Sequence, residues 1–193
     1  MSKILLLSSG LKHAQNYAHP FLERLEVYLT HQCDYVDVRN TKSFDERTFF
    51  QYDQVIFIFF TALDSIPSST LEMFHKLEGQ KKENQDIYSL IICDEFEIEK
   101  CDLSEKIVKQ WCQTENLNYN GSLKIGSGLF IMKTASRFIV SKYIKDFAGA
   151  IVKRNEYYSR VTLFNENVFM KKGNQYWSKE IKKKKKEKKK DAK

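Results

Sequence analysis

The sequence predicts an α/β protein built on a parallel, doubly wound sheet. Apolar runs rich in β-branched and aromatic residues lie within residues 3–9, 55–60 and 88–94, as in strands that are buried on both faces. Segments with apolar residues at helical spacing separate these runs. Strands that alternate with helices in this way are typical of parallel sheets with helices on both faces.

The other elements of the first half follow in chain order. A helix is expected over about residues 16–30, and residues 33–39 are expected to form a shorter strand whose partial alternation suits a sheet edge. After the strand at 55–60 a short polar turn leads to Pro67. Proline suits the first turn of a helix, so a helix is expected to begin there.

In the second half, a helix is expected to begin near residue 102. Residues 122–131 are expected to form a fifth strand, interrupted by Gly126 and Gly128. Glycines inside a strand leave room for the close approach of a neighbouring helix or a ligand. A long helix is expected over about residues 135–156, where apolar side chains recur near helical spacing.

Composition places the chain among globular proteins. Its 193 residues suit one domain with a sizeable core, and 42% of them are hydrophobic and 13% aromatic. No stretch approaches the roughly 20 apolar residues that a membrane span requires. The first residues also lack the pattern of a signal peptide. We therefore expect a cytoplasmic protein without a membrane span.

The four cysteines, Cys33, Cys93, Cys101 and Cys112, have no C-x-x-C spacing, and we expect free thiols rather than disulfides. Cys93 is interpreted as a small buried side chain rather than a nucleophile, because no histidine with a nearby carboxylate supplies a base. No paired carboxylates, G-x-S-x-G, Walker loop or metal-binding cluster occurs. The sequence therefore predicts no catalytic side chain and no metal.

The net charge of +7 comes entirely from the C-terminus. Residues 179–193 hold ten lysines against three acidic residues, whereas the preceding 178 residues balance to zero. We therefore predict a folded domain over residues 1–178 and a lysine-rich tail over 179–193 that is disordered or transiently helical. The tail is either simply solvated or associates weakly with anionic membranes or nucleic acid. The body has no basic, aromatic-interleaved patch that would predict specific nucleic-acid binding.

Four segments carry a family resemblance: KILLLSSGLKHAQN, FFTALDSIPSSTLEMF, ICDEFE and WCQTENLNYNGSLKIGSG. Together they resemble the flavodoxin-like superfamily, and within it the NAD(P)H-dependent FMN reductase branch. The similarity covers about residues 3–150 and extends weakly to GNQYW at 173–177. It implies a five-stranded parallel sheet in the order 2-1-3-4-5, with helices on both faces and FMN held by the loops after strands one, three and four.

The same resemblance implies the residues that would hold FMN. A phosphate needs backbone N–H groups at a helix N-terminus, hydroxyl groups and a cation, and the flavin ring needs flat apolar contact and backbone hydrogen bonds. The residues expected to supply them are Ser8, Ser9, Gly10, Lys12, His13, Gln15, Asn16, Thr61, Ala62, Leu63, Asp64, Ser65, Cys93, Asp94, Glu95 and Phe96. Alternatively, Ser8 and Ser9 cap the first helix, and Asp64 and Ser65 only shape the turn before Pro67.

Two departures from the family pattern leave two functions open. Gly10 and Leu11 stand where the phosphate loop usually carries hydroxyl side chains, and Asp94 stands in place of a glycine and adds a negative charge. The chain is expected to be an FMN-binding oxidoreductase that moves electrons from NAD(P)H through the flavin to a small acceptor. The alternative is a binding module with a degenerate flavin site. Homodimers are common in this family, so a homodimer is expected from the resemblance alone.

Overall fold

The computed structural model describes residues 2–9, 12–61, 64–79, 85–163 and 165–191, and for residues 12–17 and 183–191 it describes the backbone only. Its strands are β1 (Lys3–Ser9), β2 (Tyr35–Asn40), β3 (Gln54–Phe60), β4 (Asp86–Ile92), β5 (Asn118–Ile125) and β6 (Tyr157–Val161). Its helices are α1 (Lys12–Thr30), α2 (Ser68–Leu77), α3 (Asp102–Thr114), α4 (Gly128–Ile131), α5 (Arg137–Val152) and α6 (Glu166–Asp191), with short 3-10 helices η1 (Glu46–Gln51) and η2 (Ile98–Cys101).

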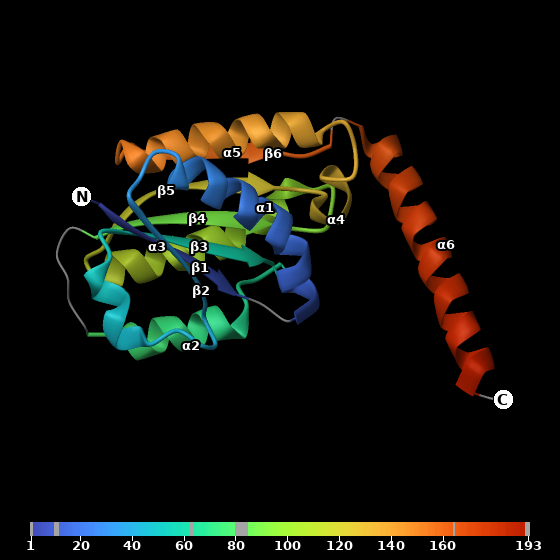
Figure 1. The fold of residues 1–193 in the computed structure, drawn as a ribbon, viewed down its shortest axis with the longest axis horizontal. Coiled ribbons are helices and arrows are strands. Elements are labelled where there is room, and N and C mark those ends of the chain that lie inside the picture. Colours follow the sequence, from blue (N-terminus) through green and yellow to red (C-terminus); the bar gives the residue numbers. More distant parts are fainter. Residues whose placement is uncertain (1, 10–11, 62–63, 80–84, 164, 192–193) are drawn as a thin grey trace.

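A single parallel sheet forms the middle layer of the protein, with α1 and α5 on one face and α2 and α3 on the other (Figure 1). Side chains alternate along each strand, so the central strands feed two cores. Leu6 and Ile58 belong to the core under α1 and α5, whereas Leu7 and Phe57 belong to the core under α2 and α3. This double burial explains why β1, β3 and β4 appear in the sequence as unbroken apolar runs.

The sheet has six strands in the order β2-β1-β3-β4-β5-β6. The order predicted for the first five is confirmed, but the predicted number of strands is wrong. The additional strand, β6, pairs in parallel with β5 at the sheet edge. Its side chains alternate between half-buried and exposed positions before the buried Val161, so it lacks the apolar run that identified the central strands.

Two predicted elements also have different boundaries. The first helix begins at Lys12 rather than near residue 16. The strand expected over residues 122–131 is two elements, because β5 ends at Ile125 and α4 begins at Gly128. The turn between them requires a left-handed backbone at Ser127, where φ is 57°, and this conformation ends the extended strand.

The C-terminal helix α6 extends away from the three layers (Figure 1). Near its start the ring of Phe169 packs against Phe130 of α4, with 5.6 Å between ring centroids. The boundary predicted at residue 178 falls inside this helix, and the independence of residues 179–193 from the folded domain stays a prediction. Within the described residues, α6 and every other helix are too short or too polar to cross a membrane.

Candidate functional site

The carboxyl ends of the strands lie side by side along one edge of the sheet. The N–H of Thr61, just after β3, donates to Ile92 O at 2.8 Å, and the N–H of Cys93 donates to Ile125 O at 2.9 Å. The N–H of Gly126 in turn donates to Val161 O at 2.9 Å. These bonds keep the loops after four neighbouring strands in register. Ligands of open α/β sheets bind at this edge.

At the end of β1 both serines are buried and bonded within the protein. Ser8 O accepts from the N–H of Thr41, and the hydroxyl of Ser9 lies 2.5 Å from that of Thr70 in α2. The other residues predicted for this loop divide into two groups. Gly10 lies outside the described residues, and Lys12, His13, Gln15 and Asn16 are placed by backbone only in the first turns of α1.

The loop after β3 carries an ion pair to the next loop. Asp64 adopts a left-handed conformation, with φ of 62°. Its Oδ2 lies 2.7 Å from Nζ of Lys100 in η2. The hydrogen bond and charge of Asp64 raise the pKa of Lys100, so the lysine carries its positive charge at neutral pH. Thr61 and Ser65 of the same loop are half-buried, and Ala62 and Leu63 lie outside the described residues.

The loop after β4 holds a carboxyl group in an unusual environment. Asp94 is half-buried, and its Oδ1 is shielded from solvent without a hydrogen-bond partner among the described residues. Burial raises the pKa of Asp94 to about 6, and the charge of Glu95 adds to this effect, whereas a hydrogen bond from the backbone of Leu129 opposes it. Both protonation states are therefore accessible near neutral pH.

The turn after β5 closes on this loop from the other side. Ser127 N donates to Glu95 O at 2.6 Å, and Gly128 N donates to Cys93 O at 2.8 Å. A Cβ on Gly128 would lie 2.4 Å from Cγ2 of Ile92, so only glycine lets α4 approach the strand ends this closely. The space that a Cβ would need at Gly128 is therefore filled by the protein itself.

Two buried thiols lie behind the same loop. Cys93 is buried, and its Sγ lies 3.8 Å from the carbonyl oxygens of Glu95 and Glu97. A hydrogen bond with Cys93, together with burial, raises the pKa of Cys101. Cys101 is therefore a neutral thiol, which is a poor nucleophile. All four cysteines are free, as predicted, and the described residues contain no group of three or more His, Cys, Asp or Glu side chains suited to a metal.

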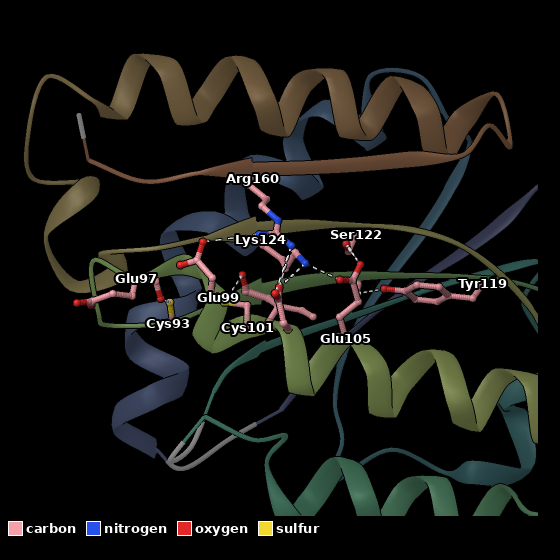
Figure 2. Close-up of polar contacts among 12 residues, drawn as sticks. Cys93, Glu97, Glu99, Cys101, Glu105, Tyr119, Ser122, Lys124 and Arg160 are labelled. Atoms are coloured by element: carbon pink, nitrogen blue, oxygen red, sulfur yellow. Dashed lines mark hydrogen bonds and ion pairs between the residues drawn. The ribbon is translucent and has the colours of Figure 1, made fainter. Parts of the chain in front are cut away.

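A charged cluster that the sequence analysis missed lies between α3 and the outer strands (Figure 2). Lys124 of β5 is only 4% exposed. Its Nζ lies 2.7 Å from Oδ1 of Asp102 and 2.5 Å from Oε2 of Glu105. Arg160 of β6 also contacts Asp102, with 3.1 Å between Nη2 and Oδ1. The cluster therefore joins α3 to both β5 and β6.

Asp102 of this cluster is held in the ionised form. Burial acts to raise the pKa of Asp102, but the hydrogen bond and charge of Lys124, with help from Arg160, outweigh it and lower the pKa. Glu105 additionally accepts a hydrogen bond from Ser122. Because the cluster is internally paired, its evident role is structural. The sequence does carry a signal for this cluster. Two acidic residues, three positions apart, begin a predicted helix, and a lysine lies inside the strand that follows.

Comparison with known proteins supports the fold. No protein-family model and no curated sequence matches the chain. Among solved structures, a flavodoxin from Streptococcus pneumonia TIGR4 is 12% identical with a TM-score of 0.64, over 79% of this chain and 99% of its own.

Two further structures were solved with a bound cofactor. A Fusobacterium nucleatum flavodoxin bound to flavin mononucleotide is 11% identical with a TM-score of 0.60, over 80% of this chain and 99% of its own. An FMN-dependent NADH-azoreductase from Bacillus anthracis str. Ames Ancestor, in complex with FMN, is 8% identical with a TM-score of 0.62, over 79% and 100%. The chain therefore has the fold of the flavodoxin-like superfamily.

Proposed function

We propose that the chain binds FMN at the carboxyl edge of its sheet and is an oxidoreductase that moves electrons from NAD(P)H through the flavin to a small acceptor. The observation that carries this proposal is the similarity of fold over almost the whole length of two proteins solved with FMN. The convergence of the loops after β3, β4 and β5 at one edge adds support, because separate loops can form one pocket there.

The phosphate end of the site would lie at the start of α1. This helix begins at Lys12, directly beyond the carboxyl end of β1. The first N–H groups of a helix attract anions, and a nearby cation adds to that attraction. We assign this role to the backbone around Gly10 and to Lys12 and His13, with Gln15 and Asn16 as further polar groups.

The ring end would lie between residues 61–65 and 93–96. When bound, FMN supplies the redox chemistry, which explains why the chain needs no catalytic acid, base or nucleophile of its own. Asp94 has a buried carboxyl oxygen without a partner and a pKa raised by burial to about 6. Such a group can accept or donate a hydrogen bond near neutral pH, and we assign it to a polar edge of the ring.

One observation favours the second function, a flavodoxin-like binding module without catalysis. The hydroxyl of Ser9 is buried against Thr70, so it is not presented to a phosphate in this conformation. If the phosphate loop lacks this donor, the fold would serve as an interaction surface rather than as a flavin carrier. The two functions differ in whether FMN binds at all.

Titration of the full-length protein with FMN, followed by quenching of flavin fluorescence, separates the two functions. The oxidoreductase proposal expects saturable quenching, and anaerobic addition of NADH or NADPH to the complex should bleach the flavin. Absence of saturable quenching at high micromolar FMN would favour the binding module. Saturable quenching without bleaching by either nucleotide would retain flavin binding and reject NAD(P)H as the electron donor.

The position of the phosphate is tested by Lys12→Met. A hydrogen bond to a charged oxygen contributes about 1.5–3 kcal/mol, so this variant should weaken FMN binding roughly ten- to a hundredfold. Riboflavin, which lacks the phosphate, should bind both proteins equally. The matched control is Lys142→Met, which removes an exposed lysine of α5. Equal losses for FMN and riboflavin would show that the phosphate does not lie at this loop.

A further inference from the structure

Among the side chains that the structure describes, those that join α6 to the rest of the protein lie on one side of the helix. Phe169 and Tyr176 are half-buried against Phe130, with 5.6 and 5.9 Å between the ring centroids. Nζ of Lys133 lies 5.6 Å from the centre of the Tyr176 ring. Beyond this attachment the helix extends away from the sheet and its covering helices (Figure 1). Most of its circumference is therefore open to a partner.

A second side of α6 exposes large apolar side chains. Met170, Trp177 and Ile181 are 53%, 59% and 54% exposed. At about 100° per residue, these positions fall within roughly 40° of one another around the helix axis. Their side chains line one side of the helix, next to the attached side, and we call this set the apolar stripe. Exposed apolar residues gathered on one helix face indicate a surface that binds something.

The same helix carries the whole net charge of the protein. Lys179 and Lys182 are exposed just beyond Trp177, and the sequence from 179 to 193 contains ten lysines and three acidic residues. The rest of the chain is electrically balanced. The partner that complements this helix must therefore combine negative charge with an apolar layer.

We propose that α6 binds an anionic membrane surface. The helix would lie in the headgroup layer, with Met170, Trp177 and Ile181 toward the acyl chains and the lysines toward lipid phosphates and carboxylates. Amphipathic helices with a basic face bind membranes in this way, and tryptophan favours the interface between headgroups and acyl chains. This inference does not depend on FMN binding.

Two other kinds of partner match the surface of α6 less well. A second copy of α6 would bring one excess of seven positive charges against another, which opposes association. Nucleic acid would neutralise the lysines through its phosphates, but it would leave the apolar stripe without a nonpolar layer. Of these three partners, the anionic lipid surface alone matches both the apolar stripe and the positive charge.

The fluorescence of Trp177 reports the proposed binding directly. The chain has two tryptophans, and Trp111 is buried against Phe74, with ring centroids 4.1 Å apart. We expect vesicles of phosphatidylcholine with about a quarter phosphatidylserine to shift the emission of the full-length protein to shorter wavelength, whereas pure phosphatidylcholine vesicles should not. Raising the salt should weaken the binding. Failure to bind the phosphatidylserine vesicles would overturn the proposal.

Matched variants separate the stripe from the charge, with cosedimentation as the measurement. Trp177→Ser should weaken vesicle binding about tenfold, whereas Phe138→Ser, which removes a 67% exposed aromatic from α5, should not. The triple variant Lys182→Gln, Lys184→Gln and Lys186→Gln should bind about a hundredfold more weakly, since each lysine near the surface contributes a factor of about five. The corresponding arginine variant should bind like the wild type.

Two results would contradict the proposal even if the vesicles bind. Equal losses for Trp177→Ser and Phe138→Ser would show that the stripe does not enter the membrane. The second result is displacement of the protein from vesicles by a duplex oligonucleotide at a concentration much lower than that of the lipid. If Trp177→Ser then had no effect on oligonucleotide binding, α6 would be assigned to nucleic acid instead.

Discussion

The hydroxyl oxygen of Ser9, at the end of β1, lies 2.5 Å from the hydroxyl oxygen of Thr70, in the first turn of α2. Ser9 is 1% exposed and Thr70 is fully buried. The bond therefore fixes the start of α2 to the strand that precedes the proposed phosphate loop. Ser9, for which the sequence left open a role in ligand binding or in capping α1, thus has a hydrogen-bond partner on α2.

Ser9→Ala is expected to lower the free energy of unfolding by about 1–3 kcal/mol, because it leaves the buried Thr70 hydroxyl without its partner. The double variant Ser9→Ala with Thr70→Val should cost clearly less than the sum of the single variants. Urea denaturation measures all three, with Ser178→Ala on the exposed side of α6 as the control. Additive losses would show that the two hydroxyls do not depend on each other.

Lys124→Met is expected to lower the free energy of unfolding by about 3–5 kcal/mol. It removes the buried cation that lies between Asp102 and Glu105 and leaves these two half-buried carboxylates without it. Adding Glu105→Gln should restore part of the loss. The control Lys109→Met, at an exposed position of α3, should change stability by less than about 0.5 kcal/mol. A similar small change for Lys124→Met would contradict the structural role of the cluster.

Asp94→Asn is expected to raise the melting temperature at pH 7–8, with the gain disappearing as the pH falls toward 4. Burial raises the pKa of Asp94 from its ordinary value of 3.8 to about 6 in the folded protein. Well below pH 4 the carboxyl group is protonated in both the folded and the unfolded state, whereas above about pH 6 the folded protein must accommodate a half-buried negative charge. The wild-type residue therefore costs stability as the pH rises through this window. The exposed Asp146→Asn serves as the control, and a gain that is independent of pH would exclude titration of Asp94 as its cause.

Deletion of residues 179–193 is expected to change the free energy of unfolding by less than about 0.5 kcal/mol, because the attachment of α6 to the body is made by Phe169 and Tyr176, which remain. The same deletion should leave FMN titration unchanged and abolish binding to anionic vesicles. A large loss of melting temperature would show that the deleted segment docks on the body.

The buried half of the fold could be predicted because its strands are apolar on both faces. Val55, Phe57 and Phe59 face one core while Ile56 and Ile58 face the other, so the whole run is visible in the sequence. The edge strand β6 is different. It has five residues, and Tyr158 and Arg160 face solvent, so neither length nor apolar content distinguishes it from a loop.

The candidate site was predictable at the level of loops and less so at the level of side chains. A parallel sheet brings the ends of β3 and β4 together whatever their sequence, which is why residues 61–65 and 93–96 were expected to be neighbours. The partner of Ser9 lies 61 positions later in the chain, and the cation beside Asp102 lies 22 positions later. Such pairings depend on three-dimensional packing that local patterns do not contain.

The two outer strands of the sheet also determine how the protein behaves toward other copies of itself. Both are short, with six residues in β2 and five in β6. Each carries charged side chains. Asp37 and Arg39 form an ion pair on β2, and Arg160 of β6 forms an ion pair with Asp102 of α3. Short, charged edges are poor templates for strand pairing between molecules. Aggregation into extended sheets would therefore first require one of these strands to detach, exposing the apolar β1 or the longer β5.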